Sequence, residues 1–166
     1  ATERETAMTA TEIRPAAIGT GRAVTVLIAG AFATLAFDIY GQAISPMLGA
    51  AKLAPVGLAN GVLNALTGAG HMPTAHLMHF LTGLVAYPLG WLLIVRPAWK
   101  AAAPALPWAV PAAAYGVGLW VFALYVMASL VAGMPAFLGF SGITWVALAG
   151  HVLFALVAAG IIERRR

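Results

Sequence analysis

Cysteine is absent from the 166-residue sequence, which excludes disulfide bonds, thiolate metal sites and cysteine nucleophiles. Charged side chains are scarce as well, because only 8% of the residues are Asp, Glu, Lys or Arg, against 62% that are hydrophobic. A soluble domain of this size needs far more polar side chains to cover its surface. With a mean hydropathy of +0.93, the composition therefore predicts an integral membrane protein.

The motifs of the common enzyme classes are also missing. The sequence has no Walker phosphate-binding loop, no glycine pattern for dinucleotides after a strand, no metalloprotease motif and no paired carboxylates. Its serines have no neighbouring His and Asp in an arrangement typical of nucleophilic catalysis. We therefore expect that the protein is not an enzyme.

Four apolar stretches are long enough to cross a bilayer, which takes about 20 mostly apolar residues. They are 23–44, 76–95, 108–131 and 143–162. A polar tail at 1–22, without the apolar core of a signal peptide, precedes them, so we expect the first span to be retained. A short basic end at 163–166 follows them. The predicted fold class is all-α, with a single four-span membrane bundle over 23–162.

The basic residues predict the orientation of this bundle. The tail, the connection between spans two and three, and the C-terminus carry eight of the nine Lys and Arg residues: Arg4, Arg14, Arg22, Arg96, Lys100, Arg164, Arg165 and Arg166. The other side has only Lys52. The positive-inside rule then places both termini in the cytoplasm, for a multi-pass protein of a bacterial inner membrane. It also accounts for the pI near 10.0 without a nucleic-acid partner, together with anionic lipid headgroups.

Asp38 is an ionisable residue inside the first predicted span. It lies about 24 Å from the inner end of that span at 1.5 Å per residue, close to the outer surface. Such residues are costly in lipid and usually face a partner or a functional site. We expect Asp38 and Gln42, one turn later, to be buried polar residues, with a hydrogen bond between Asp38 and His79, His151 or a backbone group at the end of a span. If Asp38 is instead a functional site, the expected function is that of a small proton-coupled carrier.

Two histidines in different spans are candidate cofactor ligands. His79 and His151 form the only credible axial pair for a b-type haem, although their expected depths differ by roughly 7 Å. A (bacterio)chlorophyll would need one axial histidine. Both "AHLMH" and "ALAGH" place Ala four residues before His, which is similar to the pattern in antenna polypeptides. A quinone is a further candidate ligand.

Histidine and methionine gather at the start of the second predicted span. The group consists of His71, Met72, His76, Met78 and His79. These side chains suit copper(I), and we take His71, Met72, His76 and His79 as candidate metal ligands. Met78 lies on a different helical face from His76 and His79. The alternative is a set of interfacial histidines that bind headgroups or loop backbone.

The long first outer loop, 45–75, carries almost no charge. Within it, the spacing places Asn60, Asn64 and Thr67 on one helical face. This pattern predicts a short amphipathic or re-entrant helix that lies in the interface or against a partner. We take these three residues as candidate partner contacts.

In general shape the chain resembles the small four-helix inner-membrane proteins of unknown function that are common in proteobacteria. The resemblance covers the whole length and carries no diagnostic motif, so it implies no functional residue. Small residues recur along the spans at spacings that permit close helix packing. Together with the polar tail, including Arg14 and Arg22, they favour an accessory, non-catalytic subunit of a respiratory or photosynthetic electron-transfer complex. Its expected partners are membrane lipids and other integral membrane subunits.

Overall fold

The computed structural model describes residues 20–165, and all regular structure in that range is helical. Four long helices are apolar enough to cross a membrane, over Thr20–Met47, Met72–Ala102, Ala109–Val131 and Gly142–Arg164. The predicted all-helical fold with four candidate spans is confirmed. The second helix is longer than expected, since it starts four residues before His76 and continues past Arg96 to Ala102. The expected connection after residue 95 is thereby shortened to 103–108.

The four long helices are composed of shorter segments. The first contains α1 (Thr20–Ile39), η1 (Tyr40–Ile44) and α2 (Ser45–Met47). The second contains α4 (Met72–Leu81), η2 (Thr82–Ala86), α5 (Tyr87–Gly90), η3 (Trp91–Val95) and α6 (Arg96–Ala102). The third contains α7 (Ala109–Val121) and η4 (Phe122–Val131), and the fourth is α8 (Gly142–Arg164). Two short helices, α3 (Pro55–Thr67) and η5 (Ala136–Phe140), lie in the connections.

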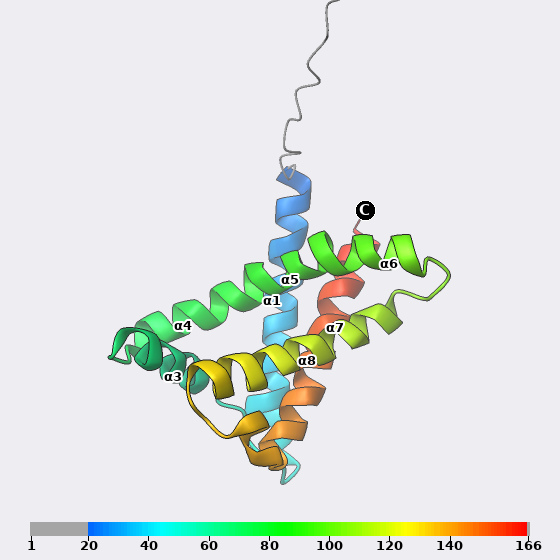
Figure 1. Cartoon of the computed structure of the whole chain (residues 1–166). Helices are drawn as coiled ribbons and strands as arrows, with labels where there is room; N and C mark the ends of the chain where they lie inside the picture. Colours follow the sequence, from blue (N-terminus) through cyan, green and yellow to red (C-terminus); the bar gives the residue numbers. More distant parts are fainter. Residues whose placement is uncertain (1–19, 166) are drawn as a thin grey trace, which may run out of the picture.

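Helix α8 is the most buried of the four long helices. It runs beside α1, and the helix containing α4 to α6 and the helix containing α7 and η4 cross this pair in the view of Figure 1. Small residues make the close approach possible, because Ala147, Gly150, Ala155 and Ala159 are all buried along α8. Membrane helices associate largely through such packing rather than through the hydrophobic effect.

Gly116 and Gly30 mark the closest backbone contacts between helices. A Cβ atom added at Gly116 would lie 2.5 Å from Cα of Val152 and 2.8 Å from the carbonyl oxygen of His151. One added at Gly30 would collide with the backbone carbonyl of Leu84. Only glycine therefore fits where α7 meets α8 and where α1 meets η2.

Three of the wide π-helical segments end two residues before a proline. The segments η1, η2 and η3 are followed by Pro46, Pro88 and Pro97, each at the start of the next α-helical stretch. A proline inside a helix removes one N–H donor and collides with the carbonyl four residues earlier. A wider turn before the ring is one way to accommodate it. At Pro88 this wider turn is the π-helical segment η2.

The short helix α3 and the connection 132–141 lie at the same end of the bundle as the start of α4. The expected helix in the first outer loop is present, and it packs against α4 and η4 of its own chain. Its buried residues are Ala59 and Val62. In the second connection, Phe137, Leu138, Gly139 and Phe140 form a left-handed turn with φ between 49° and 72°. The Thr144 hydroxyl donates to the carbonyl of Phe137 at 2.5 Å and fixes this turn.

Candidate functional site

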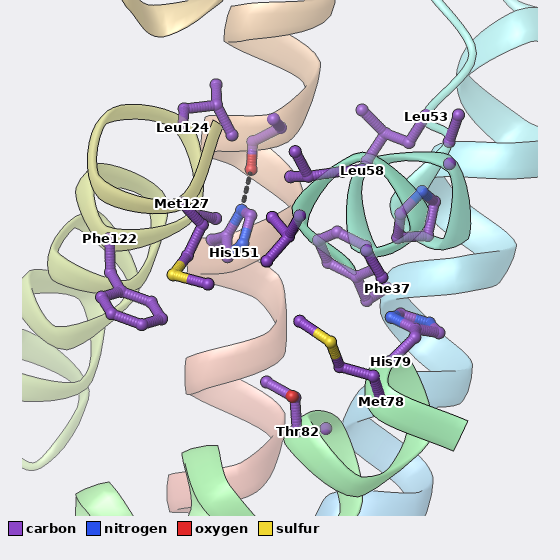
Figure 2. A pocket seen from close by; sticks show the side chains of 18 of the residues that line it. Phe37, Leu53, Leu58, Met78, His79, Thr82, Phe122, Leu124, Met127 and His151 are labelled. Carbon is purple, nitrogen blue, oxygen red and sulfur yellow. Dashed lines mark hydrogen bonds between the residues drawn. The ribbon is translucent and has the colours of Figure 1, made fainter. Parts of the chain in front are cut away.

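A cavity of about 610 Å³ lies between α1, the second and third long helices, α8 and α3. We call it the central cavity. Figure 2 shows side chains from these helices turning toward one common space. Almost all of them are apolar. The side chains that carry polar groups are Thr34, His79, Thr82, Tyr87 and His151.

Two π-helical segments, η2 and η4, form opposite parts of the cavity wall. Thr82, Gly83 and Ala86 come from η2, and Ala123 and Met127 are among the residues from η4. The widened turns change the direction of side chains relative to a regular α-helix, and such turns are frequent at functional sites. Ala86 of η2 and Phe122 of η4 line the cavity and are also exposed. Both lie within helices that are long and apolar enough to cross a membrane.

His151 is the most buried ionisable residue of the cavity wall, with 6% of its surface exposed. Its Nδ1 lies 2.7 Å from the carbonyl oxygen of Ala147, one helical turn earlier, as the dashed line in Figure 2 shows. A carbonyl only accepts, so Nδ1 carries the hydrogen and donates it. The Phe37 ring and the imidazole pack in a T-shaped arrangement, with 5.1 Å between ring centroids. The second ring nitrogen, Nε2, has no hydrogen-bond partner among the described residues.

Asp38 contacts His79 on another long helix, as the sequence predicts. Nε2 of His79 lies 3.1 and 3.2 Å from the two carboxylate oxygens of Asp38. Gln42 donates from its side-chain amide to the same carboxylate at 2.9 Å. Asp38 is partly buried, whereas Gln42, which we expected to be buried, is exposed. The carboxylate therefore has two polar partners although it lies within an apolar helix.

The two candidate cofactor histidines line the same cavity, despite the difference in depth that helix positions suggest. The Phe37 ring contacts both, with its centroid 6.5 Å from that of His79 and 5.1 Å from that of His151. The two imidazoles do not offer the same atoms, however. Nε2 of His79 is occupied by Asp38, whereas Nε2 of His151 is available. A haem bound by both rings through Nε2 would require that the Asp38 contact break.

The candidate metal ligands at the start of the second long helix are engaged separately. Nδ1 of His71 lies 2.7 Å from the hydroxyl of Thr74, and His76 stacks on Phe80 with 6.5 Å between centroids. Met72 is exposed. Within residues 20–165, no three His, Asp or Glu side chains gather as a metal site. The copper hypothesis stays a prediction, and a copper site here would need methionine sulfur among its ligands.

The candidate partner contacts on α3 are divided between internal and exposed positions. The Asn60 side chain lies against Gly70, and the Thr67 hydroxyl donates to the carbonyls of Leu63 and Ala69 at 2.8 and 2.9 Å. Asn64 and Arg22 are exposed. Arg14 lies outside the described residues. The partner role of these residues stays a prediction.

Several residues of the central cavity carry no signal in the sequence. Met127 and Phe122 lie in a continuous apolar run, where any side chain could equally face lipid. Phe37 looks like an ordinary apolar neighbour of Asp38. Only the way in which the long helices cross brings the side chains of Phe37, Phe122 and Met127 around one cavity.

Comparisons with known proteins found no relative of this chain. The chain matches no known family model, no curated protein and no solved structure.

Proposed function

We propose that the protein binds a lipophilic small molecule of the quinone class in the central cavity, within the membrane. The observation that carries this proposal is the cavity itself, with a volume of about 610 Å³ and a wall that is apolar apart from a few side chains. Binding sites for small molecules and cofactors typically measure about 300–1,000 Å³ and combine apolar walls with a few polar groups. Two of the polar groups here are the imidazoles of His79 and His151.

The position of the cavity favours a ligand that arrives from the lipid phase. Its edge at Ala86 and Phe122 lies within the long apolar helices. The other end is covered by α3 and by the connection that carries Leu138. A water-soluble substrate would have to pass this cover, whereas a molecule dissolved in the bilayer would not.

Filling the cavity is expected to remove the bound molecule. In the variant Ala123→Phe, a ring would occupy the space beside η4, because Ala123 lines the cavity. We expect an organic extract of the native protein, purified in mild detergent, to contain one apolar small molecule that mass spectrometry identifies. The variant should retain at most about a tenth of it, as a loss of about 1.4 kcal/mol in binding would produce.

A matched control is Val121→Phe, two residues earlier on a surface position. It adds the same side chain outside the cavity and should retain the molecule. An absorption spectrum of the same sample distinguishes a quinone from a haem or a pigment. Equal retention by Ala123→Phe and Val121→Phe would contradict the proposal.

The accessory-subunit hypothesis stays a second prediction. A small membrane subunit can bind such a ligand and also belong to an electron-transfer complex, so the two hypotheses are compatible. Its proposed contacts are the tail, of which residues 1–19 lie outside the described range, and the exposed side of α3.

We also propose that both termini lie in the cytoplasm of a bacterial cell. Arg96 donates from Nε to Glu163 at 2.9 Å, which places the start of α6 beside the C-terminal end of α8. The basic residues Lys100, Arg164 and Arg165 are therefore near this end, as the positive-inside rule requires of the cytoplasmic side.

The topology has a direct test. A reporter that works only in the cytoplasm should be active when it is fused after Arg166. A reporter that works only outside the cytoplasm should be active when it is inserted near Gly57 in α3. The reverse pattern would contradict the orientation, and the same location for both would contradict the four-span arrangement.

A further inference from the structure

We infer that the central cavity selects a lipophilic hydroquinone, or a similar phenol, over the corresponding quinone, with the ligand hydroxyl donating to Nε2 of His151. This inference rests on the proposed function and specifies the chemical form of its ligand. It concerns binding of two redox forms and includes no redox step.

The first step of the argument is the tautomer of His151. Nδ1 lies 2.7 Å from the Ala147 carbonyl in a buried position, and this carbonyl can only accept. The neutral ring therefore carries its single hydrogen on Nδ1 and a lone pair on Nε2. The other neutral tautomer would direct two lone pairs at each other across that short distance. Helix α8 thus fixes His151 as a hydrogen-bond acceptor.

The second step is the exposure of Nε2. His151 lines the cavity. Three side-chain polar atoms of the described residues are buried without a hydrogen-bond partner, and Nε2 of His151 is not among them. It makes no hydrogen bond within residues 20–165, so the atom has accessible surface, and we infer that this surface faces the cavity that the ring lines. A ligand that donates a hydrogen bond would satisfy this lone pair, and a ligand that can only accept would leave it unpaired.

The third step compares the other polar groups of the wall. The hydroxyls of Thr82 and Tyr87 can donate or accept, so they serve a quinone carbonyl and a hydroquinone hydroxyl equally. The Thr34 oxygen is buried without a partner and packs against Gly83, so it does not reach the cavity. His79 directs Nε2 at the Asp38 carboxylate, so that nitrogen is already engaged within the protein. The discrimination therefore falls on Nε2 of His151, which only accepts.

The test compares three ligands that have the same apolar tail. Decylhydroquinone, decylbenzoquinone and the dimethyl ether of decylhydroquinone are titrated anaerobically against the purified full chain, and each dissociation constant is corrected for partition into empty micelles. We expect decylhydroquinone to bind about tenfold more tightly than the other two, a difference of about 1.4 kcal/mol, because it alone donates a hydrogen bond and the other two leave the buried acceptor unpaired. The ether needs no change in the protein, so this comparison does not depend on a variant that folds.

The variant His151→Phe tests the assignment of the hydrogen bond. It keeps an aromatic ring beside Phe37 and removes both nitrogens. The tenfold preference for decylhydroquinone should therefore disappear, while decylbenzoquinone binds as before. The variant His71→Phe, outside the cavity, should keep the full preference.

Equal binding of all three ligands to the native chain would overturn the inference and leave the proposed function standing. Tighter binding of the quinone would also overturn it. Failure of all three to bind, under conditions where the protein is folded, would overturn the proposed function together with the inference. A preference that survives His151→Phe in a folded protein would refute the role of His151.

Discussion

Gly116→Ala is expected to lower the free energy of unfolding by about 1–3 kcal/mol, the usual cost of overpacking a tight contact. The added methyl group would meet backbone atoms of α8, with Cα of Val152 at 2.5 Å and the carbonyl oxygen of His151 at 2.8 Å. Backbone cannot move aside as a flexible side chain can, so α7 and α8 would have to separate. The separation would also disturb the wall of the central cavity at His151.

The control is Gly118→Ala on the same helix. A Cβ atom at Gly118 would have no other atom within 4 Å, and alanine is favoured over glycine in a helix by about 1 kcal/mol. Unfolding by a denaturing detergent in mixed micelles can be monitored by circular dichroism. Gly118→Ala should be the most stable of the three proteins, the native chain intermediate and Gly116→Ala the least stable. Similar values for the two variants would show that α7 and α8 are not in backbone contact at Gly116.

Trp91→Ala is expected to destabilise the chain further, by about 3–5 kcal/mol, as measured for large aromatic residues removed from cores. Trp91 is completely buried, and its ring lies 6.2 Å from both Trp99 and Tyr115, between centroids. In a bilayer the loss is mainly one of packing contacts, because lipid tails are as apolar as the protein interior. A void within the bundle has no lipid to fill it.

Two further variants separate the causes of this effect. Ile94→Ala, at a position that is 70% exposed on the same helix, should cost little because lipid replaces the lost contacts. Trp91→Phe should retain much of the stability, since Nε1 of Trp91 is buried without a hydrogen-bond partner in the described part of the chain and no hydrogen bond is lost. The same mixed-micelle titration applies. If Trp91→Ala were as stable as Ile94→Ala, the packing of η3 against α6 and α7 would be refuted.

Much of the architecture could be predicted from hydropathy alone, because a span is long, apolar and bounded by polar residues. The contact between Asp38 and His79 was predictable for a different reason. A carboxylate in a span requires a partner, and few polar side chains are present at that depth. The helix α3 followed from its spacing, although its apolar side covers the bundle of its own chain.

The central cavity could not be predicted in this way. Its wall depends on where the π turns lie and on how the long helices cross, and neither is encoded in a periodic pattern. Gly116 and Gly118 illustrate the difficulty, since the sequence suggests a packing role for both and the structure gives one only to Gly116. Which face of an apolar helix is internal depends on its neighbours. For the same reason, Met127 could not be distinguished from a lipid-facing residue.

The left-handed turn at 137–140 shows where the fold overrides local preference. Three large residues, Phe137, Leu138 and Phe140, adopt positive φ, at a cost of about 1–2 kcal/mol each. Glycine would relax the backbone at each position but would remove the ring contacts of Phe137 with Trp120 and Tyr125 and the part of the cavity wall that Leu138 supplies. The turn is therefore specified by the tertiary structure around it, and its handedness is a property of the assembled bundle rather than of the four residues themselves.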